Sequence, residues 1–311
     1  MARVVVEGWA PEYGAPIEPD DALAPAEGSV GEDVETADWR PRDGVDDGVE
    51  TVAFVDGVRR VDARLVIDDP EAGPIPGICG TYAVGAVAWD RRRPASEVVS
   101  DQVARLAVLG GGRAEALPAT DLDPPYTSAS TPATDPADLL RELHTAMRRA
   151  EGAVASELAV GSFVIADGPL NELVRRPCVG LVKTHRVTYL SPERNRVVRE
   201  LAPGTRTPLF TIADYRRYSW YVRIARVAFG HGWSGIVRCE ASGQLPLEEV
   251  ARLADRTAAL LPLVASAPHL DPRAPQNLVP IGALERRLRH RMGDQGLVVR
   301  ALREAAAREV A

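Results

Sequence analysis

Residues 51–57 read Thr-Val-Ala-Phe-Val-Asp-Gly, and residues 162–168 read Ser-Phe-Val-Ile-Ala-Asp-Gly. Each stretch is a short apolar run that ends in Asp-Gly, the pattern of a buried strand followed by a turn. We therefore expect two buried strands, each with a carboxylate, Asp56 or Asp167, at its C-terminal end. If the strands are neighbours in one sheet, both carboxylates lie at the same edge of that sheet.

The segments around these two stretches also show strand and helix patterns. Further strands are predicted at 60–67, 80–89, 178–183, 221–227 and 234–240. A long helix is predicted at 137–158, after Asp135-Pro136, and more helices at 247–261, 281–292 and 295–310. Residues 117–138 are dense in Pro, Thr, Ser and Asp and are expected to be irregular. This order predicts an α/β fold with a mixed sheet flanked by helices.

The distribution of charge is uneven along the 311 residues. The formal net charge of −7 by itself argues against a nucleic-acid partner. However, residues 1–50 hold 14 acidic and 3 basic residues, whereas residues 171–240 hold 13 basic and 5 acidic residues. We expect 1–50 to be a loosely ordered acidic arm and 51–311 to be the folded domain. The arm either solubilises the protein or occupies a basic groove, and the arginines from Arg175 to Arg238 are expected to follow a nucleic-acid backbone.

Composition and motif content exclude several classes of protein. No run reaches the roughly 18 apolar residues of a transmembrane helix, and the N-terminus lacks the apolar core of a signal peptide. Three widely separated cysteines suit a reducing compartment better than a disulfide framework. Neither a GxxxxGK[ST] phosphate loop nor a G-x-S-x-G hydrolase motif occurs. We therefore expect a cytoplasmic protein with no membrane segment.

Paired carboxylates at one sheet edge predict a site for Mg²⁺ or Mn²⁺, which prefer oxygen ligands. Two such ions about 4 Å apart can promote phosphodiester hydrolysis. A third acid is expected from the long helix, where Glu151 is preferred over Glu142 and Glu157. Lys183, the only lysine of the chain, follows the Asp167 motif and can contact a substrate phosphate. A simpler interpretation stays open, in which each Asp-Gly is only a turn and Lys183 only a surface residue.

The sequence resembles the NurA-type nucleases over roughly residues 52–292. The matching pieces, in chain order, are Phe54-Val55-Asp56-Gly57, a helix with Glu151, Ile165 to Leu170, Gly180 to Lys183, Tyr221 to Ile224 and Gly235 to Glu240. Individually these pieces are short, and the resemblance rests on their order and spacing.

The resemblance implies a ribonuclease-H-like core and a homodimer. It implies Mn²⁺-dependent (or Mg²⁺-dependent) single-strand endonuclease and 5′-to-3′ exonuclease activity on DNA. It also implies a role in DNA-end processing and repair beside a HerA-type hexameric ATPase translocase. By the same resemblance Asp56, Glu151 and Asp167 are the metal-binding acids.

The sequence departs from the family pattern at two places. Residue 58 is Val58 where the family usually has serine, so a hydroxyl is missing but no carboxylate is lost. Near the C-terminus the family has a tyrosine and a histidine. Here no equivalent tyrosine is found, His290 is the candidate histidine, and Glu285 competes with it for the position. These departures keep an alternative function open, a non-catalytic nuclease-like scaffold that binds DNA and docks on a motor ATPase.

Overall fold

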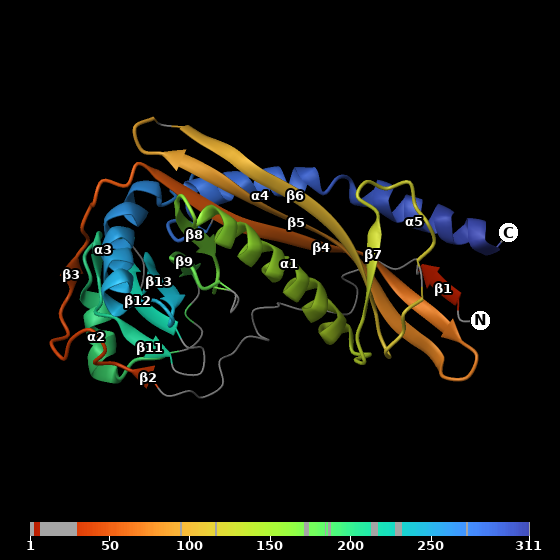
Figure 1. Cartoon of the computed structure of the whole chain (residues 1–311), viewed down its shortest axis with the longest axis horizontal. Coiled ribbons are helices and arrows are strands. Elements are labelled where there is room, and N and C mark those ends of the chain that lie inside the picture. The colour runs from red at the N-terminus through yellow and green to blue at the C-terminus, as the bar shows by residue number, and fades with distance from the viewer. Residues whose placement is uncertain are drawn as a thin grey trace.

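The computed structural model describes residues 3–6, 30–93, 95–115, 117–170, 174–183, 185, 188–212, 217–227, 232–271 and 273–310. Over these residues the chain forms a thirteen-stranded sheet with helices on both faces (Figure 1). The strands are β1 (Arg3–Val6), β2 (Val30–Gly31), β3 (Arg42–Asp43), β4 (Thr51–Asp69), β5 (Gly73–Asp90), β6 (Ala95–Leu109), β7 (Tyr126–Ser130), β8 (Phe163–Asp167), β9 (Cys178–Val182), β10 (Thr205–Arg206), β11 (Phe210–Ile212), β12 (Arg217–Arg223) and β13 (Ile236–Ser242). The helices are α1 (Pro136–Leu158), α2 (Pro192–Glu200), α3 (Leu247–Val264), α4 (Val279–Arg291) and α5 (Gln295–Val310).

The centre of the sheet has the strand order β6-β5-β4-β8-β9. Strands β4, β5 and β6 are consecutive antiparallel partners, while β8 runs parallel to β4 and β9 runs parallel to β8. Beyond β9 the sheet continues through β13, β12, β11 and β2 in antiparallel pairs. The predicted mixed α/β fold is therefore confirmed.

Strand β4 differs from the prediction because it does not end at Asp56-Gly57. It is continuous from Thr51 to Asp69 and pairs with β5 throughout, with a shift in register between Val61 and Ala63. Asp56 therefore lies inside a strand, and the segment predicted as a second strand at 60–67 is the continuation of the first. The long strands β4, β5 and β6 extend well beyond α1 (Figure 1).

The second Asp-Gly pair lies where the pattern predicts it. Asp167 is the last residue of β8, and Gly168 has a φ of 81°, a left-handed conformation that favours glycine. The parallel pairing of β8 with β4 ends at the partners Val55 and Ala166. Asp56 and Asp167 follow these partners directly, so they lie side by side at the same level of the sheet.

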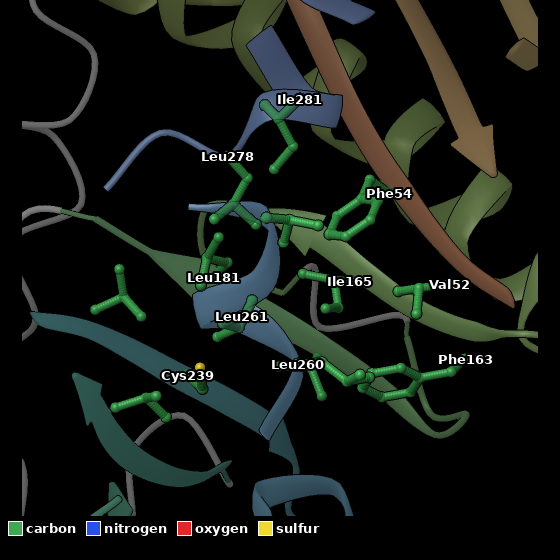
Figure 2. Packing of buried hydrophobic residues seen from close by; sticks show 14 of the residues in the cluster. Val52, Phe54, Phe163, Ile165, Leu181, Cys239, Leu260, Leu261, Leu278 and Ile281 are labelled. Carbon is green, nitrogen blue, oxygen red and sulfur yellow. The ribbon is translucent and has the colours of Figure 1, made fainter. Parts of the chain in front are cut away.

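Alternate residues of β4 and β8 pack on opposite faces of the sheet, as side chains of a strand do. One set lies in the core cluster beneath α3 and α4 and includes Val52, Phe54, Phe163 and Ile165 (Figure 2). The other set packs with residues of α1 and includes Ala53, Val55, Val164 and Ala166. Asp56 and Asp167 continue the first set, so both carboxylates face the side of α3 and α4.

Most helices agree with the prediction to within a few residues. Helix α1 follows Asp135, whose side chain accepts a hydrogen bond from the backbone N–H of Ala137 at 2.7 Å. Strand β6 and helix α2 were not predicted, and β7 lies in the segment 117–138 that was expected to be irregular. None of the helices in the described part of the chain is both long and apolar enough to cross a membrane.

Residues 30–50 of the predicted acidic arm pack against the rest of the fold. Strands β2 and β3 pair with β11 and β10, and Glu35 forms an ion pair with Arg206 at 2.8 Å. Asp46 pairs with Arg91 at 2.6 Å. The expectation of a loosely ordered arm is therefore wrong for residues 30–50. Residues 1–2 and 7–29 of the arm lie outside the described residues.

Candidate metal centre

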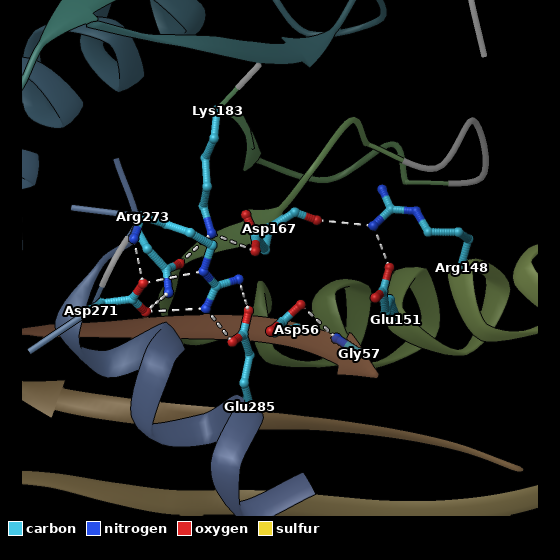
Figure 3. Close-up of polar contacts among 10 residues, drawn as sticks. Asp56, Gly57, Arg148, Glu151, Asp167, Lys183, Asp271, Arg273 and Glu285 are labelled. Carbon is cyan, nitrogen blue, oxygen red and sulfur yellow. Dashed lines mark hydrogen bonds and ion pairs between the residues drawn. The ribbon is translucent and has the colours of Figure 1, made fainter. Parts of the chain in front are cut away.

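Three carboxylates from distant parts of the chain meet on the face of the sheet that α4 covers. Asp56 of β4, Asp167 of β8 and Glu285 of α4 each offer an oxygen atom, and these three atoms all lie within 4.8 Å of one another (Figure 3). We call these three residues the carboxylate cluster. Two of its members were predicted from the Asp-Gly pattern, and the third is the residue that competed with His290.

Helix α4 approaches Asp56 closely because the neighbouring position on β5 is a glycine. Gly85 is the cross-strand partner of Asp56. A Cβ atom at Gly85 would lie 3.0 Å from Leu288 and 3.3 Å from Leu284, both on the buried side of α4, and 2.5 Å from the backbone oxygen of Ser100. The missing side chain therefore lets α4 pack directly on the sheet and places Glu285 beside Asp56.

Asp56 is the most unfavourable charge of the carboxylate cluster. Its side chain is almost entirely buried, with 6% of the residue exposed. Oδ1 accepts a hydrogen bond from the backbone N–H of Gly57 at 2.8 Å, whereas Oδ2 is buried and has no hydrogen-bond partner among the described residues. Burial raises the pKa of Asp56 well above its ordinary value, and the nearby Asp167 and Glu151 carboxylates raise it further.

The other two carboxylates of the cluster are paired with cations. Lys183 Nζ donates to Asp167 Oδ2 and to Asn277 Oδ1, both at 2.6 Å. Arg273 donates to the two oxygens of Glu285, at 2.9 and 2.5 Å. Lys183 therefore lies at the site, as the sequence predicts, although its partner in this structure is a carboxylate.

A short polar chain connects these two cations. Arg273 also donates to both oxygens of Asp271, at 3.2 and 3.1 Å, and holds the pKa of that carboxyl well below its ordinary value. Asn277 donates to Asp271 Oδ2 at 2.6 Å and accepts from Lys183. The charges around Asp56 are therefore held in a continuous network (Figure 3). Asp271, Arg273 and Asn277 were not predicted, although they lie together in the loop that leads into α4.

Glu151 lies beside the carboxylate cluster but does not belong to the group of three. It is on α1, on the opposite face of the sheet, and its carboxylate accepts from Arg148. Burial raises the pKa of Glu151 to about 7. A Cβ atom at Gly57 would collide with the Glu151 carboxylate, so this glycine serves close packing against α1 and not a turn. Glu285 therefore takes the place in the group that the sequence predicts for Glu151.

His290 lies away from the carboxylate cluster. It is exposed in the last turn of α4, five residues after Glu285. Five residues turn an α-helix by about 140° beyond a full revolution, so the two side chains point in very different directions. The prediction that His290 is the C-terminal site residue therefore disagrees with the geometry. Val58, the position at which NurA-type nucleases usually have serine, is buried in the core cluster with Phe54.

Several arginines that were expected to contact DNA are buried inside the protein. Arg206 and Arg238 pair with carboxylates at 2.8 Å, and Arg217 pairs with Glu240 at 3.5 Å. Arg223 donates to four backbone carbonyls. These four side chains hold the fold together and are not available to a phosphate backbone. The exposed arginines among the described residues of this region are Arg175, Arg176, Arg196, Arg199 and Arg226.

The donor set of the carboxylate cluster fits a hard divalent cation. All three ligands are carboxylate oxygens, which Mg²⁺ and Mn²⁺ prefer, and no sulfur or imidazole donor belongs to the group. The buried Oδ2 of Asp56 would gain a partner from such an ion. Neither a search against protein-family models nor a search of curated proteins finds a match to this chain. The functional argument therefore depends on the site itself.

Proposed function

We propose that the chain is a divalent-metal-dependent nuclease that hydrolyses phosphodiester bonds in DNA. The observation that carries the proposal is the buried Oδ2 of Asp56, which has no hydrogen-bond partner among the described residues and lies in a group of three carboxylates. A group of acids without such an atom could be a solvated surface feature. A desolvated carboxylate close to two others is a costly arrangement that a cation relieves.

The strand order supports the ribonuclease-H-like core that we propose together with this function. In the order β6-β5-β4-β8-β9, three antiparallel strands are followed by a helix and by two strands parallel to the first. A ribonuclease-H-like core has this connectivity, and the acids on β4 and β8 occupy its two central strands. The resemblance to the NurA-type nucleases is part of the proposal, and the homodimer and the HerA-type translocase stay predictions that follow from it.

Asp56, Asp167 and Glu285 would hold Mn²⁺ or Mg²⁺ in this proposal. The bound cation would supply Lewis acidity toward the phosphodiester and lower the pKa of a water molecule. Lys183 lies beside Asp167 and would bring a positive charge to the substrate phosphate. Arg148 holds the turn after β8 by donating to the backbone oxygen of Asp167 at 2.9 Å, and so keeps this carboxylate in position.

The alternative is a nuclease-like scaffold that binds DNA without cutting it. One observation favours it: Lys183 and Arg273 already neutralise two of the three carboxylates. A pair of internal cations can make the cluster stable without any metal ion. Binding of Mn²⁺ and cleavage of DNA therefore have to be measured separately.

The test incubates labelled single-stranded DNA with the protein and Mn²⁺, and compares wild type with Asp56→Asn and Asp167→Asn. We expect cleavage by wild type that requires the metal and is lost in both variants, because each variant removes one carboxylate ligand with little change of shape. Asp101→Asn is the matched control, since this acid pairs with Arg287 on the outer surface of α4. Cleavage that persists in both site variants excludes the proposed site, and metal binding without cleavage supports the scaffold.

A further inference from the structure

Three cationic side chains lie near the carboxylate cluster, Lys183 and Arg273 on its own face of the sheet and Arg148 on the face of α1, and they are held in different ways. The guanidinium of Arg148 donates to the backbone oxygens of Asp167 and Pro169 as well as to Glu151, and its side chain is 16% exposed. Lys183 is equally buried and bridges Asp167 to Asn277. Both groups are part of the packed structure around the site.

The guanidinium of Arg273 is held differently. Its side chain is 52% exposed, and its hydrogen bonds within the described part of the chain go to the carboxylates of Glu285 and Asp271. Both oxygens of Glu285 accept from this one guanidinium. A cation bound by Glu285 would have to compete with Arg273 for these oxygens.

We propose that Arg273 is a displaceable counter-ion. In the metal-free protein it neutralises Glu285. When a divalent cation binds the carboxylate cluster, Arg273 gives up the oxygens of Glu285 and remains tethered beside the site by Asp271. Its guanidinium then contacts the phosphate of the substrate.

Charge and geometry both support this exchange. When all three are ionised, Asp56, Asp167 and Glu285 carry three negative charges in a small volume, and two positive charges on Lys183 and Arg273 offset most of them. A bound divalent cation takes over the neutralisation of the carboxylates, so one of the two internal cations can move away. Arg273 is the more exposed of the two, and its displacement loses fewer packing contacts than that of Lys183. The planar guanidinium matches two oxygens of a phosphate as well as it matches those of a carboxylate.

The metal part of this inference needs only the carboxylate cluster, whereas the phosphate part rests on the proposed nuclease function. The first measurement is the affinity for Mn²⁺ alone, by isothermal titration calorimetry, for wild type, Arg273→Gln and Arg273→Lys. Arg273→Gln is expected to bind Mn²⁺ about tenfold more tightly, the effect of removing a unit charge about 6 Å from a divalent ion at an effective dielectric constant of about 80, a value close to that of water because the Arg273 side chain is half exposed. Arg273→Lys keeps the positive charge but loses the planar guanidinium that reaches both oxygens of Glu285. The Mn²⁺ affinity of this variant is therefore expected to lie between those of wild type and Arg273→Gln.

The matched control is Arg289→Gln, which removes an exposed arginine from the last turn of α4, the helix that carries Glu285, and should leave the Mn²⁺ affinity unchanged. Circular dichroism verifies that each variant is folded, and Arg273→Lys carries the test if Arg273→Gln is not. An unchanged or weaker Mn²⁺ affinity in a folded Arg273 variant overturns the counter-ion role. If wild type itself binds no Mn²⁺, the proposed metal site is wrong as well. This outcome differs from one in which wild type binds Mn²⁺ and the Arg273 variants bind it no more tightly.

The second measurement is the affinity for a fluorescent single-stranded oligonucleotide, by anisotropy, without metal and with Ca²⁺. Wild type is expected to gain affinity on Ca²⁺ binding, and Arg273→Gln should lose about tenfold of that gain because a charged hydrogen bond to phosphate is missing. An equal gain in both proteins overturns the transfer of Arg273 to phosphate. A variant damaged only in its packing would bind Mn²⁺ less tightly, not more tightly.

Discussion

Replacing Asp56 with asparagine is expected to stabilise the metal-free protein, although the residue is buried. The substitution keeps the shape of the side chain, and its Oδ1 can still accept from the N–H of Gly57. It removes a negative charge whose Oδ2 has no hydrogen-bond partner among the described residues. The new amide can instead donate to Asp167 or Glu285, whose carboxylate oxygens lie within 4.8 Å.

The size of the effect follows from the spacing of the charges. At an effective dielectric constant of about 20, two unit charges 4.8 Å apart repel by about 3.5 kcal/mol. Lys183 and Arg273 offset much of this repulsion, so at a pH where Asp56 is ionised we expect Asp56→Asn to raise the free energy of unfolding by about 2 kcal/mol. For a protein of this size that corresponds to a rise in Tm of about 4 °C.

The assay is thermal unfolding in EDTA and again with excess Mn²⁺. Mn²⁺ at 100 times its Kd should stabilise wild type by about 2.7 kcal/mol and the variant by far less, so the order of the two Tm values reverses. The control is Asp62→Asn on the same strand. Asp62 is fully buried and accepts from Arg60, Thr81 and Tyr126, so its loss should destabilise the protein while leaving the gain from Mn²⁺ unchanged.

Two outcomes would refute the reasoning about Asp56. A lower Tm for Asp56→Asn than for wild type in EDTA would mean that the ionised carboxylate is stabilised in the folded protein. An equal gain from Mn²⁺ in wild type and variant would mean that Asp56 is not a ligand.

Three further predictions concern other parts of the fold. Burial raises the pKa of Glu151 to about 7, above an unfolded value of about 4.3. Its ionisation therefore opposes folding, and the stability of the metal-free protein falls as the pH rises through this window. Glu151→Gln should reduce this pH dependence, measured by urea unfolding at several pH values. An unchanged slope of the free energy of unfolding against pH would contradict the prediction. Gly57→Ala should lower the free energy of unfolding by about 1 to 3 kcal/mol, because the new Cβ atom collides with Glu151. The loss should be smaller in a protein that also carries Glu151→Ala. Equal losses with and without Glu151→Ala would show that the collision is not the cause. Arg206 is fully buried between Glu35 and Asp255. Arg206→Ala should therefore lower the free energy of unfolding by about 3 to 5 kcal/mol. A loss below about 1 kcal/mol in a thermal melt would contradict this, because so small a loss is typical of a surface pair.

The sequence pattern predicted the two strands of the site but not the extent of the first one. A run of apolar residues followed by Asp-Gly is typical of a strand end, and this holds at Asp167-Gly168. At Asp56-Gly57 the glycine meets a different requirement, the close approach of Glu151 from α1. Such packing depends on a helix about a hundred residues away and leaves no signal in the local sequence.

The choice between Glu151 and Glu285 depends on which face of the sheet each helix covers. Asp56 has the same parity along β4 as Val52 and Phe54, which pack under α3 and α4. The alternation of side chains along β4 therefore indicates that the third acid comes from the helix that covers the face of Val52 and Phe54. Hydrophobic spacing alone does not tell which helix that is, because α1 and α4 both present apolar stripes.

The regional charge was a poor guide to the surface. The excess of arginine between residues 171 and 240 was expected to follow DNA, yet several of these side chains are buried with Glu35, Glu240 or backbone carbonyls as partners. An arginine in a strand of alternating pattern can face either side of the sheet. The count of charges along the chain cannot distinguish an internal ion pair from an exposed one.

The three positions of the carboxylate cluster, 56, 167 and 285, are far apart along the chain. A ribosome releases the N-terminal part of a protein first, so β4 and β8 emerge long before α4 is synthesised. A nascent or truncated polypeptide that lacks α4 therefore holds only two of the three acids and leaves the core beneath that helix uncovered. If the protein cuts DNA, a nascent chain gains that capacity only once α4 has been synthesised and has packed onto the sheet.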